Sequence, residues 1–362
     1  MRALVVNAGS SSLKLRLLGE RDEVLLGHDL DAGDGSAIRG FCQDVGRVDV
    51  VGHRVVHGGS RFGEPVVIDA DVTDALASLA GLAPLQQPAA LAGIRAVAEA
   101  LPDVPAVACF DTAFHATLPA EAFTYPLPKS WRLQHGLRRF GFHGLSHAYA
   151  ARQGPVVAGT RPGRIVTCHL GSGSSLAAVV DGICRDTTMG FTPNEGIPMA
   201  TRSGSVDVGM LAWLLQAGLP VDELAYGLQH RSGLVALAGS PDMRVVTERA
   251  AVGDDDARLA VDVWLHRLAQ AIAAMAASAG GIDLLVFTGG IGERASGLRR
   301  QVAQRLAWLG VELDAESNDA VAGAGADAVV SPSGATVAVV VVHAREDIEI
   351  ARGARSALAR RR

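Results

Sequence analysis

The stretch Ala3-Leu-Val-Val-Asn-Ala-Gly-Ser-Ser-Ser-Leu-Lys-Leu-Arg-Leu-Leu18 decides the fold of this chain. It predicts a buried strand, a turn of glycine and serine, and a second strand with alternating apolar residues. The pattern recurs at Ile165-Val-Thr-Cys-His-Leu-Gly-Ser-Gly-Ser-Ser-Leu-Ala-Ala-Val-Val180. We interpret the recurrence as two related α/β domains that each open with such a hairpin, although two unrelated glycine hairpins would give the same pattern.

The composition is that of a globular chain with large aliphatic cores. A length of 362 residues favours two domains, and a 49% share of hydrophobic residues with only 4% aromatic ones predicts cores of Ala, Val, Leu and Ile. The 38 acidic and 33 basic residues offer no electrostatic case for nucleic acid as a partner. Four scattered cysteines, no leader-like N-terminus and no apolar run long enough for a bilayer favour a cytoplasmic location without a membrane partner.

Further apolar runs predict the remaining parts of an α/β fold. Strands are expected over 48–56, 104–110, 284–288 and 336–342, and helices over 89–101, 145–152, 296–309 and 348–358. Polar residues follow most of these strands, and chemistry in such sheets lies at the carboxyl ends of strands.

Three glycine-rich loops follow predicted strands and suit a ligand that carries phosphate. The first, Asn7–Ser12 with Lys14 behind it, offers backbone N–H groups, hydroxyls and a cation. The second is His169–Ser175, and the third, Thr288–Glu293, leads into a helix whose N-terminus would attract a pyrophosphate. None is a GxxxxGK[ST] P-loop, and each alone is more often a tight turn. Three of them at strand ends favour a nucleotide site.

Loops bounded by glycine also carry cationic side chains. Arg54 lies in such a loop, His143 follows Phe142 in another, and Arg202 lies in a third without any apolar pattern around it. Guanidinium groups match the geometry of carboxylate and phosphate. A surface ion pair is the commoner fate of a lone arginine, and a lone histidine is more often structural. Their shared setting favours a site for anions.

Two apolar strands end in carboxylates. Asp111 closes one of them, and Glu346 with Asp347 follows another. Carboxylates in these places suit Mg²⁺ held through water, whereas the pair 346–347 would also serve as a helix cap.

Six segments taken together resemble the acetate kinase (acetokinase) family and its propionate kinase relatives. They are Asn7–Lys14, Gly52–Gly59, Phe110–His115, Arg139–Gly144, Met189–Pro193 and Phe287–Glu293. The resemblance implies an α/β fold with two duplicated RNase H-like domains of the actin/Hsp70/sugar kinase superfamily and a nucleotide cleft between them. It implies an N-terminal acyl kinase domain over 1–150, joined by the final helix at about 347–362, a C-terminal nucleotide-binding and dimerisation domain over 151–346, and a homodimer.

The resemblance also implies an activity, which is reversible, Mg²⁺-dependent (or Mn²⁺-dependent), in-line phosphoryl transfer between ATP and acetate to give ADP and acetyl phosphate. The metal ligands would be Asn7 and Glu346, and the catalytic residues Asp111, His143 and Arg202. Arg54 would bind the substrate carboxylate, and the apolar pocket around its methyl group would consist of Val56, Leu85, Phe142 and Pro193. Nucleotide contacts fall on Lys14, His169, Leu170, Gly171, Ser172, Gly173, Asp242, Met243, Arg244, Gly290, Ile291, Gly292, Glu293 and Arg294.

A carboxylate acceptor is already ionised at neutral pH and needs no general base. We therefore expect Asp111 to orient an arginine or the metal shell rather than to accept a proton. Val56 is typical of the family members that use acetate, so it favours acetate over propionate.

Some residues depart from the family pattern. Ser172 and Arg294 each replace an asparagine, and Ser205 replaces an acidic residue. Because these departures cluster near the nucleotide, they leave the phosphoryl donor more open than the acceptor. The alternatives are a propionate or other short-chain acyl kinase, an enzyme with a donor such as pyrophosphate, and a non-catalytic ATP-binding protein of the same fold.

Overall fold

The structure, a computed structural model, describes residues 1–8, 12–31, 35–83 and 87–361. The chain divides into two compact units. Unit 1 comprises Met1–Ala116, Phe142–Tyr149 and Arg345–Arg362, and unit 2 comprises Thr117–Gly141 and Ala150–Ala344. Thr117–Gly141 belongs to unit 2 although it precedes residue 150, so the bounds of the units and the expected domain bounds differ there.

Unit 1 is built on a mixed sheet with the strand order β3-β2-β1-β4-β6-β5. Strands β1, β4 and β6 are parallel, and the sheet continues from β1 through β2, which is antiparallel to β1, to β3, which is antiparallel to β2. The hairpin pairs Asn7 with Lys14, so the two side chains share one face. The strands are β1 (Ala3–Ala8), β2 (Ser12–Leu18), β3 (Val24–Asp31), β4 (Val50–Val55), β5 (Val66–Val67) and β6 (Ala106–Phe110).

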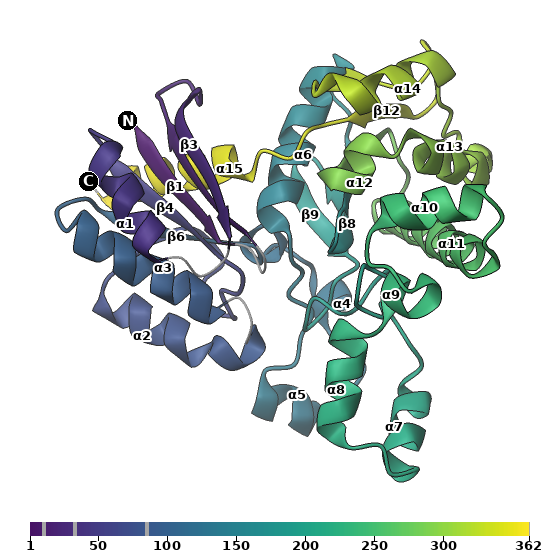
Figure 1. Ribbon diagram of the computed structural model, residues 1–362, viewed down its shortest axis with the longest axis horizontal. Helices are drawn as coiled ribbons and strands as arrows, with labels where there is room; N and C mark the ends of the chain where they lie inside the picture. The colour runs from purple at the N-terminus through teal and green to yellow at the C-terminus, as the bar shows by residue number, and fades with distance from the viewer. Residues whose placement is uncertain (9–11, 32–34, 84–86, 362) are drawn as a thin grey trace. The chain divides into compact units, whose positions relative to one another are not determined.

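Helices cover both faces of this sheet because its parallel strands are apolar on both sides. Helices α1 (Gly35–Asp44), α2 (Ala70–Ser78) and α3 (Gln87–Ala100) lie on one side (Figure 1), where Ile38 and Phe41 of α1 pack on Leu4 and Val6. The last helix, α15 (Glu346–Arg361), contacts β1, β4 and β6, and its Ile350 and Ala354 pack with Val5 in a separate apolar cluster.

Unit 2 repeats the same topology. Its strand order β9-β8-β7-β10-β12-β11 matches that of unit 1 position by position, and each pair of neighbours has the same parallel or antiparallel sense. This agreement confirms the duplication that the two hairpins predict. The strands are β7 (Arg164–Leu170), β8 (Ser174–Val180), β9 (Ile183–Thr187), β10 (Leu284–Thr288), β11 (Ala328–Val329) and β12 (Ala338–Val341).

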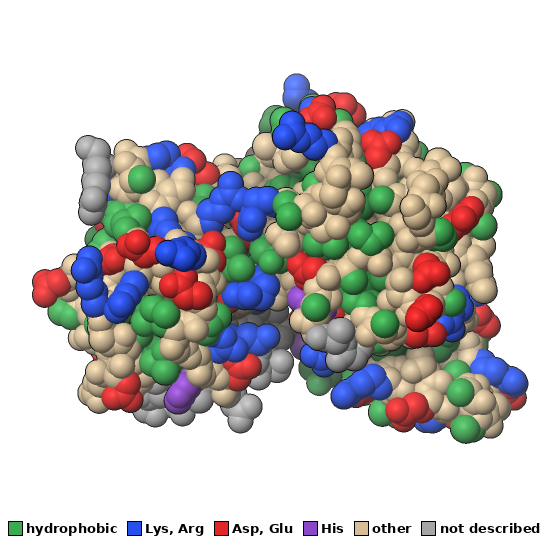
Figure 2. Space-filling view, turned by 90° about the horizontal axis from the view of Figure 1, so that it is seen from above, with side chains coloured by type: hydrophobic (Ala, Val, Ile, Leu, Met, Phe, Trp, Pro, Cys, Tyr) green, Lys and Arg blue, Asp and Glu red, His purple; other side chains and the backbone are tan. Residues whose placement is uncertain are grey.

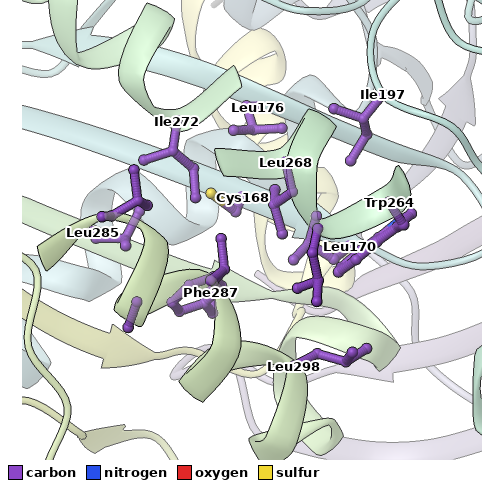
Figure 3. Packing of buried hydrophobic residues seen from close by; sticks show 14 of the residues in the cluster. Cys168, Leu170, Leu176, Ile197, Trp264, Leu268, Ile272, Leu285, Phe287 and Leu298 are labelled. Carbon is purple, nitrogen blue, oxygen red and sulfur yellow. The ribbon is translucent and has the colours of Figure 1, made fainter. Parts of the chain in front are cut away.

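The core of unit 2 forms between its sheet and the long helix α11 (Asp255–Ser278). Figure 3 shows Trp264, Leu268 and Ile272 of α11 facing side chains of the sheet that include Leu176 and Phe287. All five are buried. The predicted reliance on aliphatic side chains is thus confirmed for this core, with Trp264 as its one fully buried tryptophan among the described residues.

The remaining helices connect these layers. They are α4 (Ala120–Phe123), α5 (Lys129–His135), α6 (Gly144–Ala158), α7 (Val208–Gln216), α8 (Val221–His230), α9 (Gly233–Ala238), α10 (Met243–Ala251), α12 (Gly289–Arg294), α13 (Ser296–Arg305) and α14 (Ala315–Ala324), with short 3₁₀ turns at Ala80–Leu82, Ala113–His115 and Ala307–Leu309. Every strand and helix predicted from the sequence is present, but α6 continues six residues past its expected end at 152, and the helix expected over 296–309 consists of α13 and a separate 3₁₀ turn.

Surface charge and helix composition are the features that relate to the expected absence of nucleic-acid and membrane partners. Figure 2 shows acidic and basic side chains interspersed over the visible face of each unit. Within the described ranges, no helix combines the length and the apolar character that a bilayer crossing requires.

Candidate active site

The carboxyl ends of three parallel strands in unit 1 bring together Asn7, Arg54 and Asp111. Arg54 on β4 donates from Nε and Nη2 to both oxygens of Asp111, and the shortest of these bonds, Nη2 to Oδ2, is 2.6 Å. Its Nη1 donates to Asn7 Oδ1 at 3.4 Å. Both members of the ion pair are largely buried, with 14% and 2% of their side chains exposed. Asp111 therefore fixes the orientation of Arg54.

Glu346 joins this group from the first turn of α15. The Nδ2 group of Asn7 donates to Glu346 Oε2 at 2.8 Å. Carboxylate and amide oxygens are the ligands that Mg²⁺ prefers, and Mg²⁺ in kinases is often held by only one or two protein carboxylates with phosphates and water. The donor set of Asn7 and Glu346 fits such an ion. The described residues contain no cluster of three or more His, Cys, Asp or Glu that could enclose a metal by protein ligands alone.

Burial and charge act together on the titration of this site. Burial alone would lower the pKa of Arg54, but the carboxylates of Asp111 and Glu346 raise it by more, so its net shift is upward. Burial also raises the pKa of Asp111, while the guanidinium of Arg54 opposes that rise. Arg54 therefore stays positively charged, and the carboxylates of Asp111 and Glu346 lie close enough to stabilise that charge.

The loop that carries His143 is fixed to Asp111 through the backbone. The backbone of His143 has a positive φ of 56°. Residues other than glycine rarely adopt such an angle, and those that do are often found at functional sites. The next amide, Gly144 N, donates to the carbonyl oxygen of Asp111 at 2.8 Å. A Cβ at Gly144 would lie 2.2 Å from that oxygen, so only glycine fits there. His115 Nε2 adds a hydrogen bond of 3.0 Å with the carbonyl of Phe142.

The residues predicted to surround a substrate methyl group fall into separate parts of the structure. Val56 and Phe142 are both buried in unit 1, where the Phe142 ring meets the ring of His57 edge to face at 5.5 Å. Leu85 lies outside the described residues. Pro193 belongs to unit 2.

Arg202, the one arginine predicted to be catalytic, lies in a loop of unit 2. Its Nη1 donates to the carbonyl oxygen of Pro193 at 3.2 Å. Burial lowers the pKa of Arg202, and no described carboxylate lies within ion-pair distance of it. A half-buried guanidinium with no described carboxylate beside it is suited to an anionic ligand.

Unit 2 also contains a pocket of about 610 Å³, a size typical of sites for small ligands. Two of the predicted glycine loops, at Gly171 and Gly290, line it from the ends of β7 and β10. The other predicted residues in its lining are Ser172, Asp242, Met243, Arg244, Ile291 and Arg294. Asp242 caps α10 by accepting from Arg244 N, and it also pairs with the Arg244 guanidinium at 2.6 Å.

Other predicted nucleotide residues do not line the pocket. His169, Gly173 and Gly292 lie next to lining residues, and the side chain of Leu170 packs in the core. Glu293 is buried, and its Oε1 accepts from Gly289 N at 3.0 Å and from Ala344 N at 2.9 Å. This carboxylate therefore supports the backbone of the third glycine loop. Lys14 is exposed on β2 of unit 1, opposite Asn7.

The sequence interpretation did not include some residues of the pocket. Thr247 and Glu248 line it from the second turn of α10. Their spacing from Met243 and Arg244, four residues in each case, places them on the same face of the helix and would have been a usable signal. Pro241, Ala200 and Ala295 also line it, and these residues carry no comparable signal.

Comparisons with known proteins agree with this geometry. The model of the acetokinase family matches residues 37–352. The chain belongs to the acetokinase family. An acetate kinase from Nostoc punctiforme (strain ATCC 29133 / PCC 73102) is 46% identical over 308 residues, which cover 84% of this chain and 75% of that protein.

Solved structures extend the likeness to the whole chain. Porphyromonas gingivalis acetate kinase matches with a TM-score of 0.90 at 33% identity and 99% coverage of both chains. A propionate kinase from Francisella tularensis subsp. tularensis SCHU S4 matches with a TM-score of 0.90 at 32% identity, over 98% of this chain and 99% of that one. A proposed N-acetylmannosamine kinase from Listeria monocytogenes shares the fold alone, at 10% identity and a TM-score of 0.50.

These likenesses confirm two predictions. The fold is the two-domain α/β fold of the solved acetate and propionate kinases, and a sugar kinase at 10% identity shares it as a fold alone. As a member of the acetokinase family, the protein is a phosphotransferase with a carboxyl group as acceptor.

Proposed function

We propose that this acetokinase catalyses the reversible, Mg²⁺-dependent transfer of a phosphoryl group between ATP and acetate, giving ADP and acetyl phosphate. The observation that carries the proposal is the buried ion pair of Arg54 and Asp111 beside the Asn7–Glu346 contact. An oriented arginine suits a small carboxylate, and the paired oxygen ligands suit a metal that accompanies a nucleotide. The names of the most similar relatives support acetate as the acceptor.

Phosphoryl transfer needs two anions brought together and negative charge neutralised in line. Arg54, held by Asp111, would bind the acceptor carboxylate through the part of its guanidinium that Asp111 leaves exposed. Arg202 and His143 would donate to oxygens of the transferring group. Bound Mg²⁺ supplies positive charge beside the phosphates, and Asn7 with Glu346 would hold it.

The nucleotide would occupy the pocket lined by Gly171, Gly290 and Met243. Backbone N–H groups of the two glycine loops suit phosphates, and the apolar side chain of Met243 suits a base. Glu293 supports this site indirectly by fixing Gly289 N.

An alternative phosphoryl donor is favoured by one specific observation. Arg294 lines the pocket with an exposed guanidinium that makes no ion pair within the described part of the chain. A free arginine there would suit a smaller, more highly charged donor such as pyrophosphate.

The apolar residues predicted around the methyl group of the acceptor would discriminate only weakly by size. One additional methylene group changes the binding free energy in an apolar pocket by only about 1–3 kcal/mol. Propionate is therefore the alternative acceptor.

The direct test is a hydroxamate assay for acyl phosphate over a matrix of donors and acceptors. ATP and pyrophosphate would each be combined with acetate, propionate and butyrate, with and without Mg²⁺. We expect ATP with acetate and Mg²⁺ to give the highest kcat/KM. If acyl phosphate formed with pyrophosphate but not with ATP, pyrophosphate would be the phosphoryl donor. Nucleotide binding without any acyl phosphate would instead favour a non-catalytic ATP-binding protein.

We propose in addition that the protein is a homodimer that associates through α7 and α8. Neither of these two described helices has a buried side chain, and Val208, Trp213 and Val221 are 81%, 64% and 66% exposed. Figure 1 draws both helices away from the sheet of their own unit. An apolar surface of this kind typically marks a protein interface, and a second copy would bury the same side chains on both partners. Light scattering of the wild type and Trp213→Glu tests this, with a monomeric wild type as the contradicting result.

A further inference from the structure

A polar network in unit 2 encloses the segment that carries Pro193. Its centre is Glu195, whose Oε1 accepts from Arg139 Nη2 at 2.6 Å and whose Oε2 accepts from the Tyr125 hydroxyl at 2.5 Å. The Tyr125 oxygen in turn accepts from Phe191 N at 3.0 Å. Burial, followed by the hydrogen bond to Glu195, raises the pKa of Tyr125, so the hydroxyl remains a donor.

Arg139 also forms hydrogen bonds to the backbone at the start of this segment. Its Nη1 donates to three successive carbonyl oxygens, those of Thr187, Thr188 and Met189, at 3.0–3.1 Å. The backbone that follows it adds a bond from Phe140 N to the carbonyl of Gly190 at 3.0 Å. Only 16% of the Arg139 side chain is exposed. One arginine therefore neutralises Glu195 and satisfies the carbonyls at the start of the segment.

The packing around Gly190 leaves little space. A Cβ at this position would lie 1.8 Å from Glu195 Oε2 and 2.1 Å from the Tyr125 hydroxyl. The backbone at Gly190 is thus in direct contact with the side chains of Glu195 and Tyr125. Loss of either polar group would remove one of the contacts that hold this backbone.

The segment leads to the catalytic arginine. Arg202 Nη1 donates to the carbonyl oxygen of Pro193, which lies two residues before Glu195. A second link closes the loop, because Ser205 N donates to Gly196 O at 2.8 Å and Gly196 N donates to Ser205 Oγ at 3.1 Å. Arg202 makes the first attachment itself, and the second lies three residues after it, at Ser205. No described carboxylate pairs with Arg202, and its Nη1 contacts the Pro193 carbonyl and, at 3.7 Å, Met199 Sδ, so the position of Pro193 is one of the two described restraints on its direction.

We propose that Tyr125, Glu195 and Arg139 are positioning residues that hold the segment 189–196 and, through the Pro193 carbonyl, aim Arg202 at the transferring phosphoryl group, a role that rests on the proposed function. None of the three needs to touch a substrate for this. A shift of about 1 Å in such a group can cost roughly 10²-fold in rate.

The test is a double-mutant cycle of Tyr125→Phe and Arg202→Lys, measured by the hydroxamate assay with ATP and acetate. We expect Tyr125→Phe to lower kcat roughly 10-fold to 10²-fold while both KM values stay near those of the wild type. In the Arg202→Lys background the same change should cost no more than about twofold, because the group it positions is already altered. Equal losses in the two backgrounds, or an unchanged kcat in Tyr125→Phe, would overturn the proposal.

The control is Arg305→Leu. It removes another partly exposed ion pair of unit 2, between Arg305 and Asp262 at 2.9 Å, that touches neither the segment nor Arg202. It should lower the melting temperature and leave kcat unchanged. If Tyr125→Phe does not fold, Glu195→Gln takes its place, since it keeps the shape of the side chain and removes the charge that Arg139 neutralises.

Hydrogen exchange separates failure of this proposal from failure of the proposed function. We expect Tyr125→Phe to lose amide protection over residues 187–205, and Arg305→Leu to retain it there. If the wild type forms no acyl phosphate, the proposed function fails, and loss of protection confined to 187–205 would still support the positioning network. Unchanged protection in Tyr125→Phe would overturn it whatever the wild type catalyses.

Discussion

Asn7 and Glu346 are joined by a hydrogen bond of 2.8 Å although 339 positions separate them in the sequence. The bond fixes the carboxyl end of β1 to the first turn of α15. It brings an amide and a carboxylate together at the edge of the sheet where Arg54 and Asp111 also lie. The site is therefore assembled from the two ends of the chain.

The Mg²⁺ requirement should depend on Glu346. We expect Glu346→Gln to raise the Mg²⁺ concentration needed for half-maximal rate by roughly 10-fold to 100-fold, because it removes one negative charge from the metal ligands. Titration of Mg²⁺ at a fixed ATP concentration measures this. Glu349→Gln, on the same turn of α15 and facing Arg352, is the matched control and should retain the wild-type requirement. A wild-type titration curve for Glu346→Gln would contradict the assignment.

Asp111 should act by orienting Arg54. Asp111→Asn removes the charge that orients the Arg54 guanidinium, so it should lower kcat/KM for acetate roughly 10²-fold, as a misplacement of about 1 Å does. The solvent deuterium isotope effect on the wild-type kcat should stay near unity, since no proton is transferred to the carboxylate. A large isotope effect that disappears in Asp111→Asn would establish Asp111 as a general base instead. Asp283→Asn, which breaks the ion pair with Arg164 in unit 2, serves as the control.

Arg299 should support the nucleotide pocket from behind. It is 2% exposed and donates to the carbonyls of Gly292 and Glu293 at the end of α12 and to Asn318, and burial lowers its pKa to about 10. Lysine cannot satisfy all of these acceptors. Arg299→Lys should therefore cost at least about 2 kcal/mol of stability and raise KM for ATP. KM for acetate should not change.

The neighbouring residue offers a matched control for that change. Arg300 makes an exposed ion pair with Asp319, so Arg300→Lys should cost less than about 1 kcal/mol. Urea unfolding with nucleotide titration measures both variants. Equal losses for the two lysine variants would show that burial of Arg299 contributes nothing.

Acid should destabilise the protein through buried histidines of unit 1. Burial lowers the pKa of His53 to about 3 and that of His57 and His115 to about 4. The unfolded chain takes up these protons near pH 6.5 and the folded chain does not, so stability is lost as the pH falls from about 6.5 to about 4. Each histidine contributes up to about 1.4 kcal/mol per pH unit in that window.

Replacing one of them isolates its contribution. The Nε2 atom of His53 is buried without a hydrogen-bond partner among the described residues, so His53→Met removes a titrating group without breaking a bond at that atom. Urea unfolding at pH 7.5, 6.5 and 5.5 should give a shallower pH dependence for this variant. An identical slope would mean that His53 does not resist protonation.

The sequence was sufficient for the strands and their endings. Asn7, Arg54 and Asp111 each end a parallel strand, and sheet geometry alone then brings them together. The motifs also placed Gly171 and Gly290 in one pocket, because β7 and β10 are neighbours in the sheet. In both cases the prediction follows from rules of topology that do not depend on individual side-chain contacts.

What the sequence left open depends on tertiary contacts. No pattern indicates that Glu293 accepts from the distant amide of Ala344, or that Leu170 directs its side chain into the core. The same holds for Glu195, which appears in the sequence as an ordinary acidic residue of a loop. Its partners Tyr125 and Arg139 lie 70 and 56 positions earlier, and only the folded chain brings them together.

The position of α15 has a consequence for synthesis of the protein on the ribosome. Ile350, Ala351 and Ala354 of this last helix cover Ala3 and Val5 of the first strand, and Arg355 donates to the carbonyl of Met1 and to Asp22. The nascent first sheet therefore carries an exposed apolar face until α15 has left the exit tunnel. Unit 2 is fully synthesised before that moment and is free to fold first. A truncation before Glu346 would leave that face permanently uncovered, and a chaperone is the expected binding partner of such a chain.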